Sequence, residues 1–241
     1  MKLILAIFVG FLTLAACSER VIPPVDGPQS IEFSLVYPQP PNSDAYFGVS
    51  GVRLVTDEIV RDTLVKVTGR SFFGQFYTGG AALPTQVELN GVLFERHAAT
   101  DTLRLGATDN TNLFGVQAWR LTDAEGPMTF QVAALNEIDS VAPLMYGDPL
   151  RADTALALSW RPPSTATGGV LITWRMAGVD TYSQIVTDMG RFTIPANIVG
   201  RFAGDSELIL TRFRTDQNLY RGKQLILTRV AQRNYRVSVL G

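Results

Sequence analysis

Cys17 is the residue whose type and position most clearly indicate chemistry, because it is the one cysteine in a chain of 241 residues. It follows Lys2, an apolar run from Leu3 to Leu14, and the small residues Ala15 and Ala16. A positive start, a short apolar stretch and small residues together predict a secretory signal peptide. The stretch is shorter than the ~20 apolar residues of a membrane-spanning helix, so we expect it to be removed.

The run Leu14-Ala15-Ala16-Cys17 resembles the lipobox of bacterial lipoproteins. The resemblance implies cleavage before Cys17, a diacylglyceryl group on its thiol and acylation of the new amino group. Several acyl chains anchor more firmly than one, since each buried CH₂ contributes ~0.8 kcal/mol. In some bacterial lipoproteins an Asp directly after the lipidated Cys indicates retention in the inner membrane. This chain has Ser18 at that position, so the resemblance favours the outer membrane, and the periplasmic and the surface-exposed side are both possible. A plain signal peptide and a retained anchor helix are the alternatives.

Few other residues have the spacing of a catalytic or metal site. His97 is the one histidine, so the sequence lacks a zinc site with two or three histidines, and no Gly-x-Ser-x-Gly turn suggests a catalytic triad. Asp57, Glu58 and Asp62 cluster in a way that is common at turns of β-sandwiches. We therefore expect no enzyme and no cofactor. The turn around Asp109 fits either a Ca²⁺ site or a plain polar turn.

Charge is distributed unevenly along the chain. Residues 18–140 hold eight basic and fifteen acidic side chains, a net charge of −7, whereas residues 141–241 hold twelve and seven, a net charge of +5. The total of −1 argues against a nucleic-acid partner. The asymmetry indicates either two differently composed solvated surfaces or complementarity, between the halves or towards separate partners.

An aromatic cluster is the first candidate for an interaction surface. Alternation would place Phe73 and Tyr77 on one face of a strand, opposite Phe72 and Phe76. Both faces of a sandwich strand cannot belong to the core, so one pair is expected to be exposed, packed on the second domain or docked to a partner. A bent or bulged strand that buries all four residues is the alternative.

Arginines late in the chain are the second candidate. Eighteen of the 21 basic residues are Arg, and Arg212, Arg214 and Arg229 belong to the late excess. A guanidinium group grips a carboxylate or a phosphate through two parallel hydrogen bonds. These arginines could therefore face lipid headgroups, acidic glycans or an acidic protein, and a solvated strand face is the alternative.

Short strands are the elements that must position these residues. Asn90-Gly91 between two alternating runs predicts a hairpin over 87–94, because a type I′ turn needs positive φ at both central residues. Alternation also predicts strands at 31–37, 63–67, 102–105, 116–121, 128–132, 156–162, 170–175, 182–186, 191–194, 207–213 and 224–230, with helical turns in 195–202.

The predicted fold class is all-β, with two tandem β-sandwich domains at 30–140 and 141–241. A cleaved signal peptide at 1–16 and a lipidated Pro-rich linker at 17–29 precede them. Trp160 and Trp174 are expected to face the second core, with sugar stacking as their functional alternative.

Two resemblances cover these halves. The segments Leu158–Pro162 and Leu171–Arg175, with the closing hairpin through Val239, resemble a fibronectin type III or immunoglobulin-like domain. The segments Val87–Gly91, Val116–Leu121, Phe192–Ala196 and Leu210–Arg212 are similar to those of uncharacterised two-domain lipoproteins of Bacteroidota. The resemblances imply a fold and a location but no activity.

These observations predict a lipid-anchored cell-envelope protein that acts by binding or scaffolding, without catalysis. Its expected partners are the membrane, through Cys17, and a protein of the envelope. The alternative is a surface lipoprotein that binds or cleaves glycans through aromatic and carboxylate side chains.

We expect Cys17→Ser to release or misprocess the protein and to leave the fold intact, because serine offers no thiol for the lipid. The intact mass of the membrane-extracted protein checks this, since the wild-type chain should begin at a modified residue 17. Normal processing and retained membrane association of the variant would contradict the prediction.

Overall fold

The computed structural model describes residues 45–55, 58–60, 63–65, 69–78, 83–97, 102–105, 115–165 and 167–241. They belong to one compact unit, Ile31–Gly241. Cys17, the turn around Asp109, the linker at 17–29 and the predicted strand at 31–37 lie outside the described residues.

The fold is all-β, as the sequence predicts. The described part contains one α-helix, α2 (Ala196–Val199), and 3₁₀ turns at Leu144–Tyr146 and Gly200–Phe202. The strands are β1 (Ala45–Val55), β2 (Glu58–Val60), β3 (Thr63–Val65), β4 (Gly69–Thr78), β5 (Gln86–Leu89), β6 (Val92–Leu93), β7 (Glu95–His97), β8 (Thr102–Leu105), β9 (Gln117–Asp123), β10 (Gly126–Val132), β11 (Val141–Ala142), β12 (Leu150–Arg151), β13 (Leu156–Trp160), β14 (Gly169–Met176), β15 (Val179–Val186), β16 (Arg191–Ile194), β17 (Gly204–Tyr220) and β18 (Lys223–Leu240).

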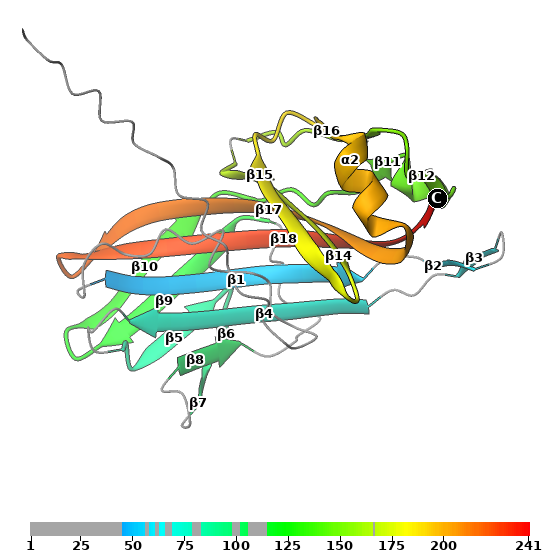
Figure 1. Ribbon diagram of the computed structural model, residues 1–241. Helices are drawn as coiled ribbons and strands as arrows, with labels where there is room; N and C mark the ends of the chain where they lie inside the picture. Colours follow the sequence, from blue (N-terminus) through cyan, green and yellow to red (C-terminus); the bar gives the residue numbers. More distant parts are fainter. Residues whose placement is uncertain are drawn as a thin grey trace, which may run out of the picture. The chain divides into compact units, whose positions relative to one another are not determined.

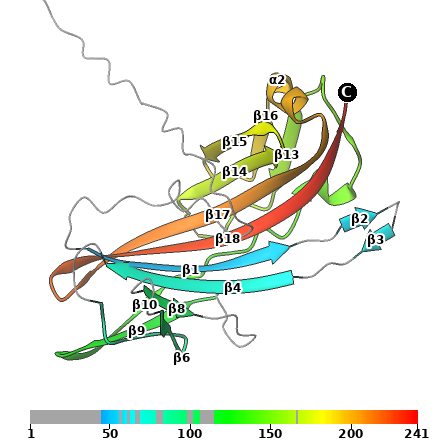
Figure 2. The ribbon, with the colours of Figure 1, turned by 60° about the horizontal axis from the view of Figure 1, so that its bottom comes forward.

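One large sheet organises the compact unit, in the order β15-β14-β17-β18-β1-β4-β8-β7, with β12 also paired to β18. At its centre β17 and β18 form a long antiparallel hairpin, and β1 joins β18 in parallel (Figure 1). The hairpin turns at Arg221 and Gly222, which have φ of 51° and 74°. Two smaller sheets, β10-β9-β5-β6 and β11-β13-β16, pack against different ends of the hairpin (Figure 2).

A hydrophobic core lies under each smaller sheet. In the first core, Trp119 stacks on Phe130 with ring centroids 6.5 Å apart and lies 5.8 Å from Phe94. In the second core, Trp174 stacks on Phe202 at 4.8 Å. All three tryptophans, Trp119, Trp160 and Trp174, are at most 5% exposed. Their indoles contribute apolar area to the cores, so the alternative of sugar stacking by Trp160 and Trp174 is wrong.

Several predicted elements are confirmed. Asn90 and Gly91 have positive φ, 50° and 81°, in the tight turn between β5 and β6. The predicted helical turns in 195–202 are α2 and the following 3₁₀ turn. The strands predicted at 207–213 and 224–230 are parts of β17 and β18.

The division into domains at residues 140 and 141, and the fibronectin type III-like assignment of the second half, stay predictions. The described residues show that the hairpin serves both cores: Tyr220, Leu225 and Leu227 belong to the first, and Leu208 and Leu210 belong to the second. Strands from both halves of the sequence thus share the large sheet.

Candidate binding site

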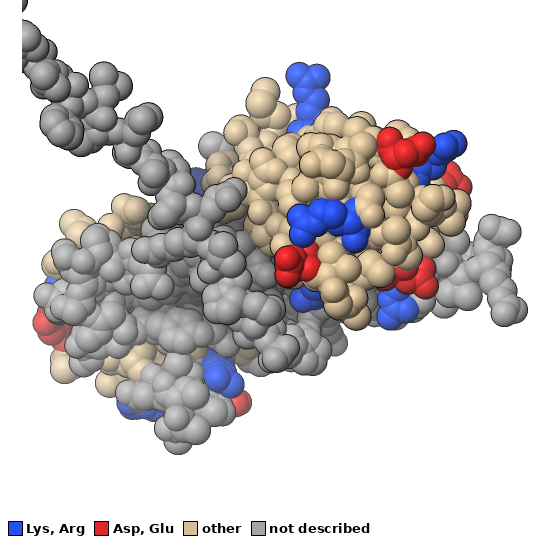
Figure 3. Space-filling model, viewed as in Figure 1, with Lys and Arg blue, Asp and Glu red and all other residues tan. Residues whose placement is uncertain are grey.

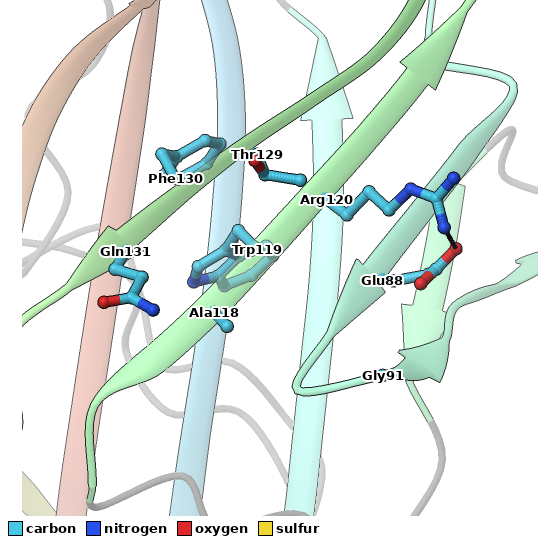
Figure 4. A pocket seen from close by; sticks show the side chains of 8 residues that line it. All are labelled: Glu88, Gly91, Ala118, Trp119, Arg120, Thr129, Phe130 and Gln131. Carbon is cyan, nitrogen blue, oxygen red and sulfur yellow. Dashed lines mark hydrogen bonds and ion pairs between the residues drawn. The ribbon is translucent and has the colours of Figure 1, made fainter.

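A shallow hollow of about 330 Å³ lies on the outer face of the sheet β10-β9-β5-β6. Residues of β9 alternate between buried and exposed, so Trp119 points into the core while Ala118 and Arg120 point outward. The small side chain of Ala118 leaves room between longer neighbours. The lining residues are Glu88, Gly91, Ala118, Trp119, Arg120, Thr129, Phe130 and Gln131 (Figure 4).

Four polar side chains around the hollow come from three adjacent strands. Arg120 Nη1 lies 3.4 Å from Glu88 Oε1, and the two side chains are 49% and 22% exposed. Thr129 lies beside Arg120 in the strand register, and Gln131 lies beside Ala118. A guanidinium, a carboxylate, a hydroxyl and an amide together can donate and accept hydrogen bonds. We call Glu88, Arg120, Thr129 and Gln131 the polar face.

The hairpin turn at the edge of the hollow is held by its own sequence. Asn90 has the positive φ that the turn requires, and its Oδ1 accepts a hydrogen bond of 2.8 Å from the backbone N–H of Ala118. The backbone N–H of Asn90 donates in return to the Ala118 carbonyl at 2.8 Å. Two hydrogen bonds therefore fix the β5–β6 turn against β9, and the hollow stands on an ordered backbone.

A second set of contacts joins the far end of this sheet to the tip of the long hairpin. Tyr220 Oη donates to Asp123 Oδ2 at 2.6 Å, and Arg221 contacts Asp123 and Glu125 and donates to the Gly126 carbonyl. The hydrogen bond from Tyr220 lowers the pKa of Asp123, and burial is the main factor that raises the pKa of Tyr220. The turn between β9 and β10 is thereby tied to the hairpin.

Arg212 is buried, with 1% of its side chain exposed, and this differs from its expected place on an interaction surface. It forms an ion pair with Asp188 at 2.7 Å and donates to the carbonyls of Asn136, Glu137 and Arg161 at 2.8–3.0 Å. Trp160 Nε1 also donates to Asp188, at 2.8 Å. The Arg212 guanidinium therefore holds three segments over the second core, because its donors reach carbonyls in two of them and the Asp188 carboxylate in the third.

The other predicted surface residues have mixed outcomes. Arg229 is 1% exposed and pairs with Asp216, so it also lies in the interior and not on a surface. Arg214 is 24% exposed and pairs with the same carboxylate at 3.1 Å. Phe73 and Tyr77 lie in β4, opposite Gly51 and Phe47 of β1, and their side chains lie outside the described part. The aromatic surface stays a prediction.

Within the described residues no group of three or more His, Cys, Asp or Glu could hold a metal ion. No helix in the same part of the chain is long and apolar enough to cross a membrane. On the face shown in Figure 3, basic and acidic side chains lie next to one another instead of forming a large patch of one sign.

No motif in the sequence indicates the polar face as a whole. Alternation within 116–121 was a usable signal, because it places Ala118 and Arg120 on the face opposite Trp119. The pairing of β5 with β9, which brings Glu88 beside Arg120 across 32 residues, has no local signal. Long-range strand pairing depends on how whole sheets pack and not on a motif.

We expect Arg212→Met to lower the free energy of unfolding by about 3–5 kcal/mol, because Asp188 would stay buried without its cation. Urea unfolding measures this loss. Arg151→Met is the matched control, since Arg151 and Asp153 form an ion pair whose side chains are 74% and 69% exposed. The control should change stability by no more than ~0.5 kcal/mol. Equal losses in the two variants would refute a structural role for the buried pair.

We expect Tyr220→Phe to raise the pKa of Asp123 towards its ordinary value of 3.8, because the variant lacks the hydrogen bond that holds it down. A lowered pKa stabilises the fold above the unfolded-state pKa, and this contribution disappears as the pH falls through the folded-state pKa. The stability difference between wild type and variant should therefore be largest near neutral pH and shrink below about pH 4. Carboxyl NMR titration of Asp123 checks the shift, and an unchanged titration would contradict it.

Comparisons with known proteins show no matching family model and no matching curated protein. Among solved structures, a Ca²⁺-stabilised adhesin that helps an Antarctic bacterium to bind ice has 14% identity and a TM-score of 0.24, over 81% of this chain and 48% of that one. The SGBP-B protein of the Bacteroides ovatus mixed-linkage glucan utilization locus, in complex with a heptasaccharide, has 15% identity and a TM-score of 0.20, over 65% and 40%. The chain spans about half of the adhesin and less of the second protein, and similarities this low carry no argument.

Proposed function

We propose that this protein is a lipid-anchored, non-catalytic binding protein of the cell envelope. The run Leu14-Ala15-Ala16-Cys17 supports the anchor, with the lipid on Cys17 and the outer membrane as the favoured location. The observation that carries the binding role is the polar face, which projects hydrogen-bonding groups from a regular sheet around a hollow. The partner is an envelope protein whose surface presents both donors and acceptors.

The chemistry of the polar face favours recognition. Glu88 is the one carboxylate among its lining residues, and it is paired with Arg120. Hydrolysis of a glycoside by two carboxylates would need a second acid within about 5–10 Å. Amide, hydroxyl and guanidinium groups can instead match a polar surface, and the pairing of β10, β9 and β5 holds the backbones that carry them.

A second ligand class fits the same groups. A glycan presents many hydroxyl groups, and Thr129, Gln131, Glu88 and Arg120 can bond them without an aromatic platform. The hollow could hold a small part of a glycan, because its volume of about 330 Å³ lies at the lower end of the usual range for ligand sites, ~300–1,000 Å³. Glycan binding is therefore the alternative outcome of the test below.

We expect Arg120→Ala to weaken capture of the envelope partner at least about tenfold, because a charge-assisted hydrogen bond contributes ~1.5–3 kcal/mol. Crosslinking in the native membrane, quantified for each captured protein, measures the change. Arg151→Ala is the control, because it also breaks an exposed ion pair, with Asp153, away from the polar face. Both variants should fold, since exposed pairs contribute about 0–1 kcal/mol.

Equal capture by the wild type, Arg120→Ala and Arg151→Ala would refute the polar face as the binding surface. Titration with soluble oligosaccharides separates the two ligand classes. Saturable oligosaccharide binding that Arg120→Ala loses and Arg151→Ala keeps would assign the face to a glycan.

A further inference from the structure

Four arginines lie on one face of the long hairpin, between the two cores. In the register of β17 and β18, Arg214 is opposite Arg229, and Leu210 is opposite Arg233. Arg212 is opposite Ala231, which is a small residue. Arg229 and Arg233 lie two residues before and two residues after Ala231 in β18. Because side chains alternate along a strand, these residues share a face. We call Arg212, Arg214, Arg229 and Arg233 the arginine band.

The carboxylates that contact the arginine band do not balance its charge. Arg212 pairs with Asp188, while Arg214 and Arg229 share Asp216. Arg233 donates from Nη1 to a backbone carbonyl, that of Ile138, at 3.2 Å. Among the described residues, these four guanidinium groups thus have two carboxylates as ion-pair partners, an excess of two positive charges.

Two of these guanidinium groups also have buried donors without a partner. Within the described part of the chain, Nε and Nη1 of Arg229 and Nε of Arg233 have no hydrogen-bond acceptor. Arg229 is 1% exposed, so water does not freely compensate for the missing acceptors. An unpaired buried donor destabilises the folded state, and more so when the group is charged. Burial lowers the pKa of Arg229 despite the opposing effect of Asp216, which agrees with incomplete compensation.

We infer that the arginine band binds a divalent tetrahedral oxyanion, a phosphate or sulfate group, with Arg229 as its main anchor. Such a group carries the charge that the band lacks, and its oxygens can accept from the guanidinium donors that have no acceptor among the described residues. Arg214 and Asp216 keep 24% and 19% of their side chains exposed, and they mark where the band reaches solvent.

This site is separate from the polar face, which lies on the outer side of another sheet. The inference therefore goes beyond the proposed function and does not depend on it. Arg120→Ala should leave the response to phosphate unchanged, so failure of one proposal is distinguishable from failure of the other.

The test is thermal unfolding of the full chain in millimolar phosphate or sulfate, against chloride at matched ionic strength. A ligand several-fold above its Kd should raise the wild-type Tm by about 2–4 °C. Arg229→Met should lose this rise, with affinity at least about tenfold weaker. The variant should fold, because Asp216 keeps Arg214 as its partner at 3.1 Å and 19% of the Asp216 side chain is exposed. Arg233→Met is the second variant, and it should lose a smaller part of the rise in Tm.

Arg151→Met is the control for the general stabilising effect of these salts, which acts on any folded chain. The Arg229 Nε–H resonance, identified by its absence in Arg229→Met, should shift with inorganic phosphate. A parallel titration with glycerol phosphate separates the free ion from a phosphate group carried by a larger ligand. Equal Tm rises in the wild type, Arg229→Met and Arg151→Met, or a resonance that does not move, would overturn the inference.

Discussion

Antiparallel pairing of β17 and β18 along almost their whole length sets the positions of both hydrophobic cores. A strand of 17 residues that pairs in one register fixes the face of every side chain along it. The same face then carries Leu208 and Leu210 at one end and Tyr220 at the other. The smaller sheets pack against these two ends, and both cores depend on one hairpin. A slip of one residue would move both sets of apolar side chains to the opposite face.

The middle of that face is polar, and this explains the buried charges. The two ends of this hairpin face belong to different cores, so its middle lies in the interval between them. Arg212 uses this interval to satisfy three loop carbonyls and Asp188, and these contacts order segments that have few backbone partners of their own. Arg229 and Arg233 are less completely satisfied. The middle of the hairpin face thus contains Arg212, which stabilises the fold, together with Arg229 and Arg233, which have buried donors without an acceptor among the described residues.

The polar face and the arginine band differ in their relation to the scaffold. Glu88 and Arg120 lie on the solvent side of a small sheet, where the proposed partner would reach them directly. The band lies against the hairpin itself, so a ligand there would interact with the element that joins the two cores. Binding at the band would therefore couple to global stability, whereas binding at the polar face would involve a surface that the cores support from beneath.

The local elements could be predicted from the sequence: alternation placed β9, β13 and β14, Asn90-Gly91 placed the hairpin turn, and Trp160 and Trp174 face their core as expected. These features depend on residues that are neighbours in the chain, and the alternation of apolar and polar residues can be read directly from the sequence. The burial of Arg212 and Arg229 follows from the tertiary fold, because it comes from strands and loops up to 76 residues away. A strand of alternating Arg residues looks the same in a sequence whether it meets water or a second sheet. The polar face likewise exists only where β5 and β9 pair, since hydrogen bonding between distant strands is set by the packing of whole sheets.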